Sequence, residues 1–204
     1  RGMESTSEDT LISSSTVRRI IERFESEDSS IRCLDSNEDP DGVWPNDDQL
    51  SKSLLHVAAE TGDAPMVKAL LAVGASADFE NEWGWTALQF ASHSGHAECV
   101  RLLLEAGADA NNMGARIQES GEPLSPPLCL AARCGRGSTD CMGHMLKWGA
   151  HVAQKCDYGM SALHHAAESG AKLEVEYLIH AGANVNLLTT LSEHADVFRT
   201  QEVK

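Results

Sequence analysis

The chain has 204 residues, of which 42% are hydrophobic but only 5% aromatic, and its formal net charge is −15. Such a chain can bury a sizeable core, built from Ala, Leu and Val rather than from large rings. We find no run of about 18 apolar residues that would suit a membrane span, and no charged start followed by an apolar signal segment. The excess of acid argues against nucleic-acid phosphates as a partner.

The acidic excess is concentrated near the N-terminus, where residues 1–50 hold 13 acidic and 5 basic side chains. Complementary charge mainly raises association rates and rejects wrong partners, so this imbalance favours a basic protein partner. The alternative is that the acid only keeps the protein soluble. The six cysteines fit a reducing compartment better than a disulfide framework, which predicts a cytoplasmic or nuclear protein.

The first 48 residues precede any clear repetition. Residues 1–15 are rich in Ser, Thr, Glu and Asp, which predicts a disordered or tag-derived tail. We interpret residues 16–48 as a degenerate capping copy of the unit described next, followed by an acidic connector. A free amphipathic helix that docks on a partner is the alternative. The apolar residues that fall on one helical face here are Val17, Ile20, Ile21 and Phe24.

From residue 53 onward a short pattern recurs with a period of about 33 residues. In each copy a leucine lies among small apolar residues, and a glycine follows seven positions later. A hydroxyl at Thr86 or Ser161 can cap a first helix, the glycine can end it, and Val100 with Leu103 and Leu104 can form the apolar stripe of a second helix. No unit can bury its stripe alone, so the units must stack. The four leucines are Leu55, Leu88, Leu128 and Leu163.

Each copy resembles the T-P-L-H-x-A-A signature of ankyrin repeats, most clearly in Thr86-Ala87-Leu88 and in Ser161-Ala162-Leu163-His164-His165-Ala166-Ala167. The resemblance implies an all-α fold, an ankyrin-repeat solenoid of stacked helix-turn-helix units joined by β-hairpin-like loops. It also implies that His56 and His164 hydrogen-bond loop backbone. The units are expected at 49–80, 81–113, 114–154 with an insertion, and 155–186, followed by a C-terminal tail or cap at 187–204.

The spacing departs from the regular period at two places in the third unit. The leucine-to-leucine steps are 33, 40 and 35 residues, which places an insertion around Asn112 to Pro126 and two further residues between Gly135 and Gly143. Insertions in repeat proteins map to loops, often on the binding face. A tolerated surface insertion is the alternative. The third unit is the least regular, and we expect it to loosen most easily.

The resemblance implies a protein-binding surface formed by the hairpin tips and the exposed side of the first helices, on the concave face. Exposed Trp side chains often dominate interface energetics, so Trp83 and Trp85 carry most weight, although Trp85 could simply shield its own hairpin. The acidic residues would suit a partner bearing Lys or Arg. The expected partner-binding residues are Glu60, Glu82, Trp83, Trp85, His93, Arg133, Asp157, Tyr158, Met160 and Glu168.

Cysteine and histidine also occur in a spacing that zinc accepts. Cys129, Cys134, Cys141 and His144 run as C-x4-C-x6-C-x2-H, but this spacing alone is weak, and their side chains need not converge. We therefore expect no metal and no cofactor.

Covalent modification is conceivable at three residues. Ser36 has an acid three residues downstream, as acid-directed kinases prefer, although solvated acid explains the same pattern. Asn111 and Asn186 end hairpins at a position that asparaginyl hydroxylases modify in similar ankyrin proteins.

Sequence motifs for catalysis are not found. The chain has no glycine-rich phosphate loop, no H-E-x-x-H and no G-x-S-x-G. We therefore predict a non-enzymatic interaction module, an adaptor or inhibitor that is monomeric alone and binds another protein or peptide, with neither nucleic acid nor membrane insertion. The alternative is a regulatory domain of a larger signalling protein that acts on another domain of the same chain.

Overall fold

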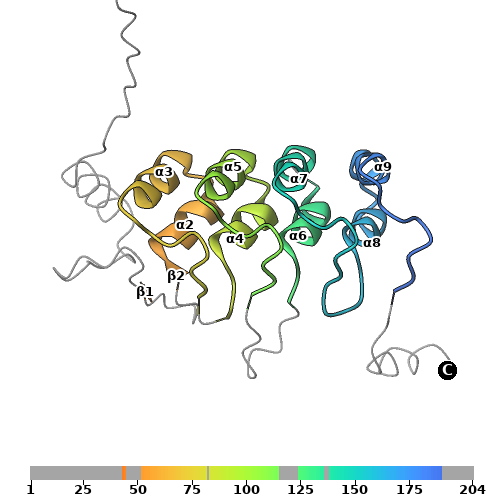
Figure 1. Ribbon diagram of the computed structural model, residues 1–204, viewed down its shortest axis with the longest axis horizontal. Helices are drawn as coiled ribbons and strands as arrows, with labels where there is room; N and C mark the ends of the chain where they lie inside the picture. Colours follow the sequence, from red (N-terminus) through yellow and green to blue (C-terminus); the bar gives the residue numbers. More distant parts are fainter. Residues whose placement is uncertain (1–42, 45–51, 82, 115–123, 136–137, 190–204) are drawn as a thin grey trace, which may run out of the picture.

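The computed structural model describes residues 43–44, 52–81, 83–114, 124–135 and 138–189. In this part of the chain the helices form consecutive antiparallel pairs that stack side by side in two rows (Figure 1). The inner row consists of α2 (Leu54–Thr61), α4 (Ala87–Ser94), α6 (Pro127–Cys134) and α8 (Ala162–Glu168). The outer row consists of α3 (Ala64–Ala72), α5 (Ala97–Glu105), α7 (Ser138–Lys147) and α9 (Lys172–His180). This is the ankyrin-repeat solenoid that the resemblance implies.

The inner helices α4 and α8 begin at the residues that the repeated pattern predicts, and α4 also ends at its predicted glycine. Thr86 Oγ1 accepts the Gln89 N–H at 3.4 Å at the start of α4, which confirms Thr86 as a helix cap. At the start of α8, His164 Nδ1 accepts the Ser161 N–H at 3.1 Å. Helix α4 ends at Gly95 with φ 77°, a left-handed conformation that residues with a Cβ avoid.

The core is one elongated layer between the two rows. The signature leucines Leu55, Leu88 and Leu128 are 1%, 0% and 2% exposed. Val100 of α5 and Cys99 beside it are also buried, as the second-helix stripe predicts. Burying one such aliphatic side chain contributes about 1.5–3 kcal/mol, so stacking between units supplies most of the stability.

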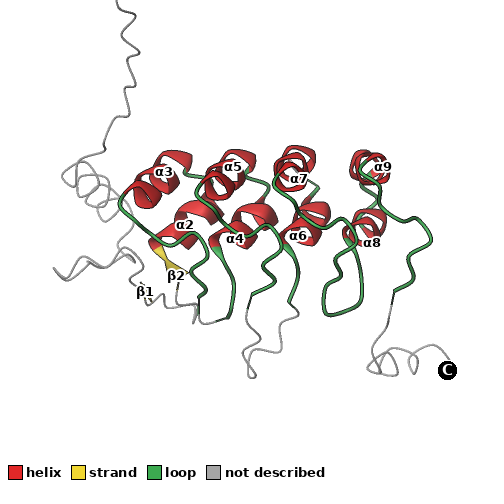
Figure 2. Cartoon of the chain, in the orientation of Figure 1, coloured by secondary structure: helices red, strands yellow, loops and turns green. Residues whose placement is uncertain are grey.

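Hairpin-like loops extend from the inner row, and Figure 2 shows the described parts of those after the first unit as loop rather than strand. Single antiparallel bridges join Glu80 to Thr86 and Lys155 to Ser161. The first unit has a short pair in the same place, formed by β1 (Val43–Trp44) and β2 (Lys52–Ser53), with Val43 opposite Ser53. Part of the segment expected to be an acidic connector therefore forms this first hairpin. The capping repeat expected before it lies outside the described residues.

Side chains at one hairpin position link the first unit to the second and the second to the third. Asp78 Oδ1 accepts the Asp109 N–H at 3.0 Å. In the next unit Asn111 Oδ1 accepts the His151 N–H at 2.8 Å, and its amide donates to the Gly149 carbonyl at 3.1 Å. Ala153 occupies the corresponding position in the third unit and has no side-chain hydrogen-bonding group. This link therefore stops before the fourth unit.

Candidate functional site

One position of the repeat lines up along the inner helices. Glu60, His93, Arg133 and Glu168 each lie five residues after a signature leucine, near the ends of α2, α4, α6 and α8. We call these four residues the inner-helix row. His93, Arg133 and Glu168 are exposed and Glu60 is half-buried. Because the units stack in register, the row forms a line of polar side chains along the inner helices.

The electrostatics of this row are mixed rather than uniformly acidic. Burial and the charge of Arg133 lower the pKa of His93, while Glu60 opposes the shift. Burial and Arg133 also lower the pKa of His165, while Glu168 opposes that shift. Arg133 thus lowers the pKa of a histidine on each of the two neighbouring inner helices. Within the row, this cation lies between the two acids, Glu60 at one end and Glu168 at the other.

The second hairpin carries both predicted tryptophans, which one buried side chain holds in place. Asn81 Oδ1 accepts the Trp83 N–H at 3.1 Å and the Trp85 N–H at 2.8 Å. The Trp85 ring lies 5.2 Å from Phe90 and 6.1 Å, edge-on, from His93. Trp85 therefore packs on its own inner helix, as the shielding alternative requires, and also touches the inner-helix row. Trp83 is half-buried.

The fourth hairpin presents its aromatic residue more openly. Tyr158 is 55% exposed, and Met160 is half-buried beside it. Asp157 is occupied within the structure, because its Oδ2 accepts the Leu124 N–H at 3.0 Å while its own N–H donates to the Leu124 carbonyl at 3.1 Å. The structure thus places Asp157 in a contact between hairpins. Glu82 lies outside the described residues.

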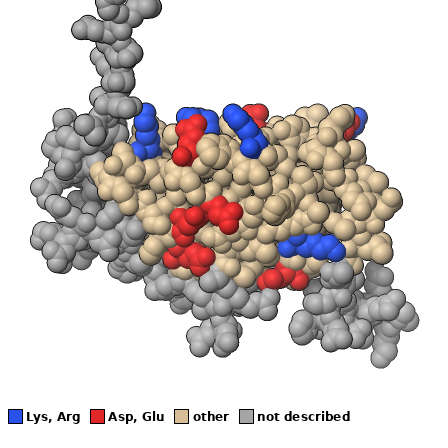
Figure 3. Space-filling view, viewed as in Figure 1, with Lys and Arg blue, Asp and Glu red and all other residues tan. Residues whose placement is uncertain are grey.

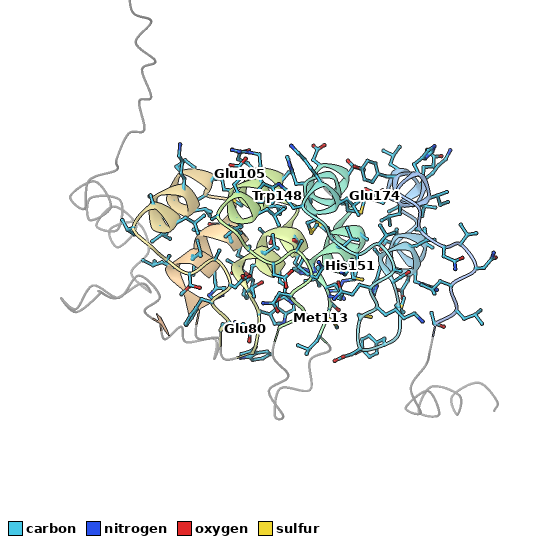
Figure 4. The ribbon with its side chains drawn as sticks, viewed as in Figure 1. Glu80, Glu105, Met113, Trp148, His151 and Glu174 are labelled. Atoms are coloured by element: carbon cyan, nitrogen blue, oxygen red, sulfur yellow. The ribbon has the colours of Figure 1, made fainter. Side chains whose placement is uncertain are left out.

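A residue that sequence reasoning did not single out anchors both ends of the insertion. Gln89 is fully buried, and its Nε2 donates to the carbonyls of Met113 at 3.1 Å and Ser125 at 3.0 Å. Its Oε1 accepts the Thr86 N–H at 2.8 Å. The residues between these carbonyls include the inserted loop at 115–123, which is not described, and Figure 4 places Met113 among the hairpins. A glutamine where the first and fourth units have histidine is the sequence signal that could have indicated this role.

A glycine at the start of the insertion permits close contact between two hairpins. Gly114 has φ 82°, and a Cβ added there would lie 1.8 Å from the Gly84 carbonyl oxygen. Any side chain would therefore push the second hairpin away from the insertion. The backbone at the start of the insertion is therefore closely packed against the second hairpin.

The signature histidines bind backbone, as the resemblance implies. The Nε2 atom of His56 lies 3.0 Å from the Phe79 carbonyl oxygen, and its Nδ1 accepts the Ser53 N–H at 3.0 Å. His56 thereby joins the start of its helix to the hairpin that follows it.

The proposed modification sites differ in their surroundings. Asn111 uses both ends of its side chain on the next hairpin, and its carbonyl accepts from Gln154 Nε2 at 2.9 Å. Asn186 is exposed and its N–H donates to Asn184 Oδ1 at 2.9 Å. Ser36 lies outside the described residues.

The described residues contain no group of three or more His, Cys, Asp or Glu side chains able to hold a metal ion. The Sγ of Cys129 lies 3.8 Å from the Gln154 carbonyl oxygen, and burial raises the pKa of Cys141 to about 12. Where helices are described, none is long and apolar enough to cross a membrane.

Known proteins resemble about two thirds of the chain. The chain is 32% identical over 139 residues to E3 ubiquitin-protein ligase KEG of Arabidopsis thaliana, covering 68% of this chain and 8% of that protein. It is 33% identical over 144 residues to the B-cell lymphoma 3 protein homolog of Mus musculus, covering 69% and 30%. An L-asparaginase of Dirofilaria immitis is 31% identical over 137 residues, covering 67% and 22%.

These matches span less than a third of each of those relatives. The family model described as ankyrin repeats, in three copies, matches residues 31–114 and 114–189. Together with the stacked helix pairs, these matches show that the chain belongs to the ankyrin-repeat family.

Proposed function

We propose that this ankyrin-repeat domain is a non-enzymatic adaptor or inhibitor that binds a protein or peptide along the inner-helix row and the adjoining hairpin tips. Ankyrin repeats in general are protein-interaction modules. The proposal includes a cytoplasmic or nuclear location, a monomer in the absence of partner, and no cofactor.

The observation that carries the proposal is the exposure of an aromatic residue at a hairpin tip beside a row of polar inner-helix residues. Tyr158 is 55% exposed, although its ring adds nothing to the buried core. Large aromatic side chains bury much area at little entropic cost when a partner covers them. Trp83 would extend the same contact surface to the second hairpin.

The charge pattern supports a partner with a basic segment, positioned by the acids at the ends of the row. Figure 3 shows small separate groups of both signs over one face of the described chain, rather than one broad acidic field. A partner would therefore be recognised by the spacing of its charges. Glu60→Lys and Glu168→Lys are expected to weaken a basic partner, and Arg133→Glu to strengthen it. Unchanged affinity in all three variants would contradict this charge preference.

A second candidate function follows from the length of the relatives. Because this region matches only 8 to 30% of those proteins, an ankyrin domain of this kind can form one part of a much longer chain. In that case the same surface would regulate another domain of its own chain. The test is to add flanking segments of the natural chain to the domain and measure whether they compete with a partner for the same binding residues.

The proposal is tested by affinity capture from a reduced cell lysate, with mass spectrometry of the captured proteins. Wild type is compared with Trp83→Ala and Tyr158→Ala, and with Trp148→Ala as a matched control. Trp148 is 47% exposed but lies beside the outer helices in Figure 4, away from the hairpins. A partner lost from the first two variants and kept by the control supports the proposal. Equal capture by all four proteins would contradict it.

A further inference from the structure

The fourth unit exposes positions that each earlier unit buries. Four residues after the signature leucine stand Ala59, Ser92 and Ala132 in the first three units, and all three are fully buried. Ala167 occupies the same position in α8 and is exposed. In each of the first three units, the unit that follows covers this position and buries it. No helix of the described chain lies beyond α8 and α9 (Figure 1).

Ala167 and neighbouring residues of the fourth unit line an apolar hollow at the C-terminal end of the array. Ile179 is 44% exposed and Val185 is 62% exposed. The hollow has a volume of about 270 Å³. We call this surface the end face, and the apolar residues that line it are Leu163, Ala167, Val175, Ile179, Val185 and Leu187.

The end face has the chemistry of a stacking surface rather than of a terminal cap. At the position of Val175, the earlier units carry Val67, Val100 and Met142, each fully buried between units. Terminal repeats need a polar outer face for solubility, and contiguous exposed apolar surface marks a place where something binds. An amphipathic helix fits such a surface, because helices cover the corresponding positions elsewhere in this chain.

We propose that residues 190–204 of the chain cover the end face as one amphipathic helix. The structure leads directly to this occupant, since Leu187 lines the hollow and stands three residues before the segment. The Lys155 ammonium donates to the Leu188 carbonyl at 2.9 Å, which holds the chain to the fourth unit two residues before the segment begins. A covalently attached segment also has a high effective concentration at the surface beside it.

The sequence of the segment has the required pattern. Leu191, Ala195 and Phe198 recur at helical spacing and form one apolar stripe, while Glu193 and Asp196 fall on the opposite side. A helix over residues 191–202 would be about 18 Å long, enough to cross two helices packed about 8–10 Å apart. A helix this short is marginal in isolation, so its formation depends on contact with the end face.

Hydrogen–deuterium exchange of the full chain tests this proposal, with Phe198→Asp compared against Val197→Asp. Val197 is the adjacent apolar residue but lies off the stripe, so both variants add one carboxylate to the same segment. We expect backbone amides of α9 to exchange about tenfold faster or more in Phe198→Asp, because a buried aromatic contact is lost. Exchange in Val197→Asp should match wild type. Unchanged exchange in α4 shows that the variants remain folded.

Equal exchange of α9 in both variants would overturn the proposal. The same measurement at two protein concentrations distinguishes a second copy of the chain as the occupant. Protection of α9 that is independent of concentration supports the intramolecular segment. Protection that rises with concentration would assign the end face to self-association and contradict the proposal.

Discussion

Replacing Asn111 with alanine removes the side chain that links the third hairpin to the base of the fourth. Two hydrogen bonds are lost, from the His151 N–H to Oδ1 and from Nδ2 to the Gly149 carbonyl. Each such bond contributes about 0.5–1.5 kcal/mol net, and water partly replaces bonds at an exposed hairpin. We therefore expect a loss of about 1–2 kcal/mol, which lowers the Tm by about 2–8 °C in a domain of this size.

Asn186→Ala is the matched control, because Asn186 holds the same hairpin position at the end of the fourth unit, with no described unit after it. Its substitution should change stability by less than about 0.5 kcal/mol. Asn111→Asp keeps an acceptor for His151 but loses the donor to Gly149, so its effect should be intermediate. Urea and thermal unfolding, followed by circular dichroism, measure all three variants. Equal destabilisation by Asn111→Ala and Asn186→Ala would refute the role of this link.

Other outcomes follow from buried polar groups and thiols. Gln89→Ala should cost about 1–3 kcal/mol in urea unfolding, because it leaves the buried Thr86 N–H without an acceptor, whereas Gln89→His should restore that contact and cost less. Folding lowers the pKa of His165 below its ordinary value of 6.5, so at pH values below 6.5 the unfolded chain binds more protons than the folded chain. The free energy of unfolding should therefore fall as the pH drops below 6.5. His165→Gln should make this fall less steep. Burial raises the pKa of Cys99 to about 11, so iodoacetamide at pH 8 should label the half-buried Cys134 well before Cys99 in peptide mass spectra of the native protein; equal labelling would contradict this.

The fold was predictable because each repeated residue has a local structural role. Thr86 caps its helix and Gly95 ends it, while the leucine between them is fully buried. These roles depend on neighbours within a few positions in sequence, which a repeated pattern makes visible. The start of the first hairpin at Val43 was missed, because a longer loop separates it from its partner strand than in the second and fourth units.

The candidate site was less predictable, because its details depend on side-chain packing and on contacts between hairpins. The sequence identifies Trp85 as a hairpin residue, but only the structure shows its ring against Phe90 and His93. From the sequence, the Asp157 carboxylate is expected to be available to a partner. In the structure it accepts a hydrogen bond from the N–H of Leu124, which lies in the insertion. The Asp157 contact joins residues 33 positions apart, and no local pattern specifies it.

Site-specific photo-crosslinking tests the central claim, that a partner binds along the hairpin tips and the inner-helix row. A photoreactive phenylalanine analogue replaces Trp83, Tyr158 or Trp148 in turn, and each protein is irradiated with the captured partner. We predict crosslinks to the partner from positions 83 and 158 and none from position 148, which lies by the outer helices. Crosslinks from position 148 alone would place the partner on the outer helices and contradict the account.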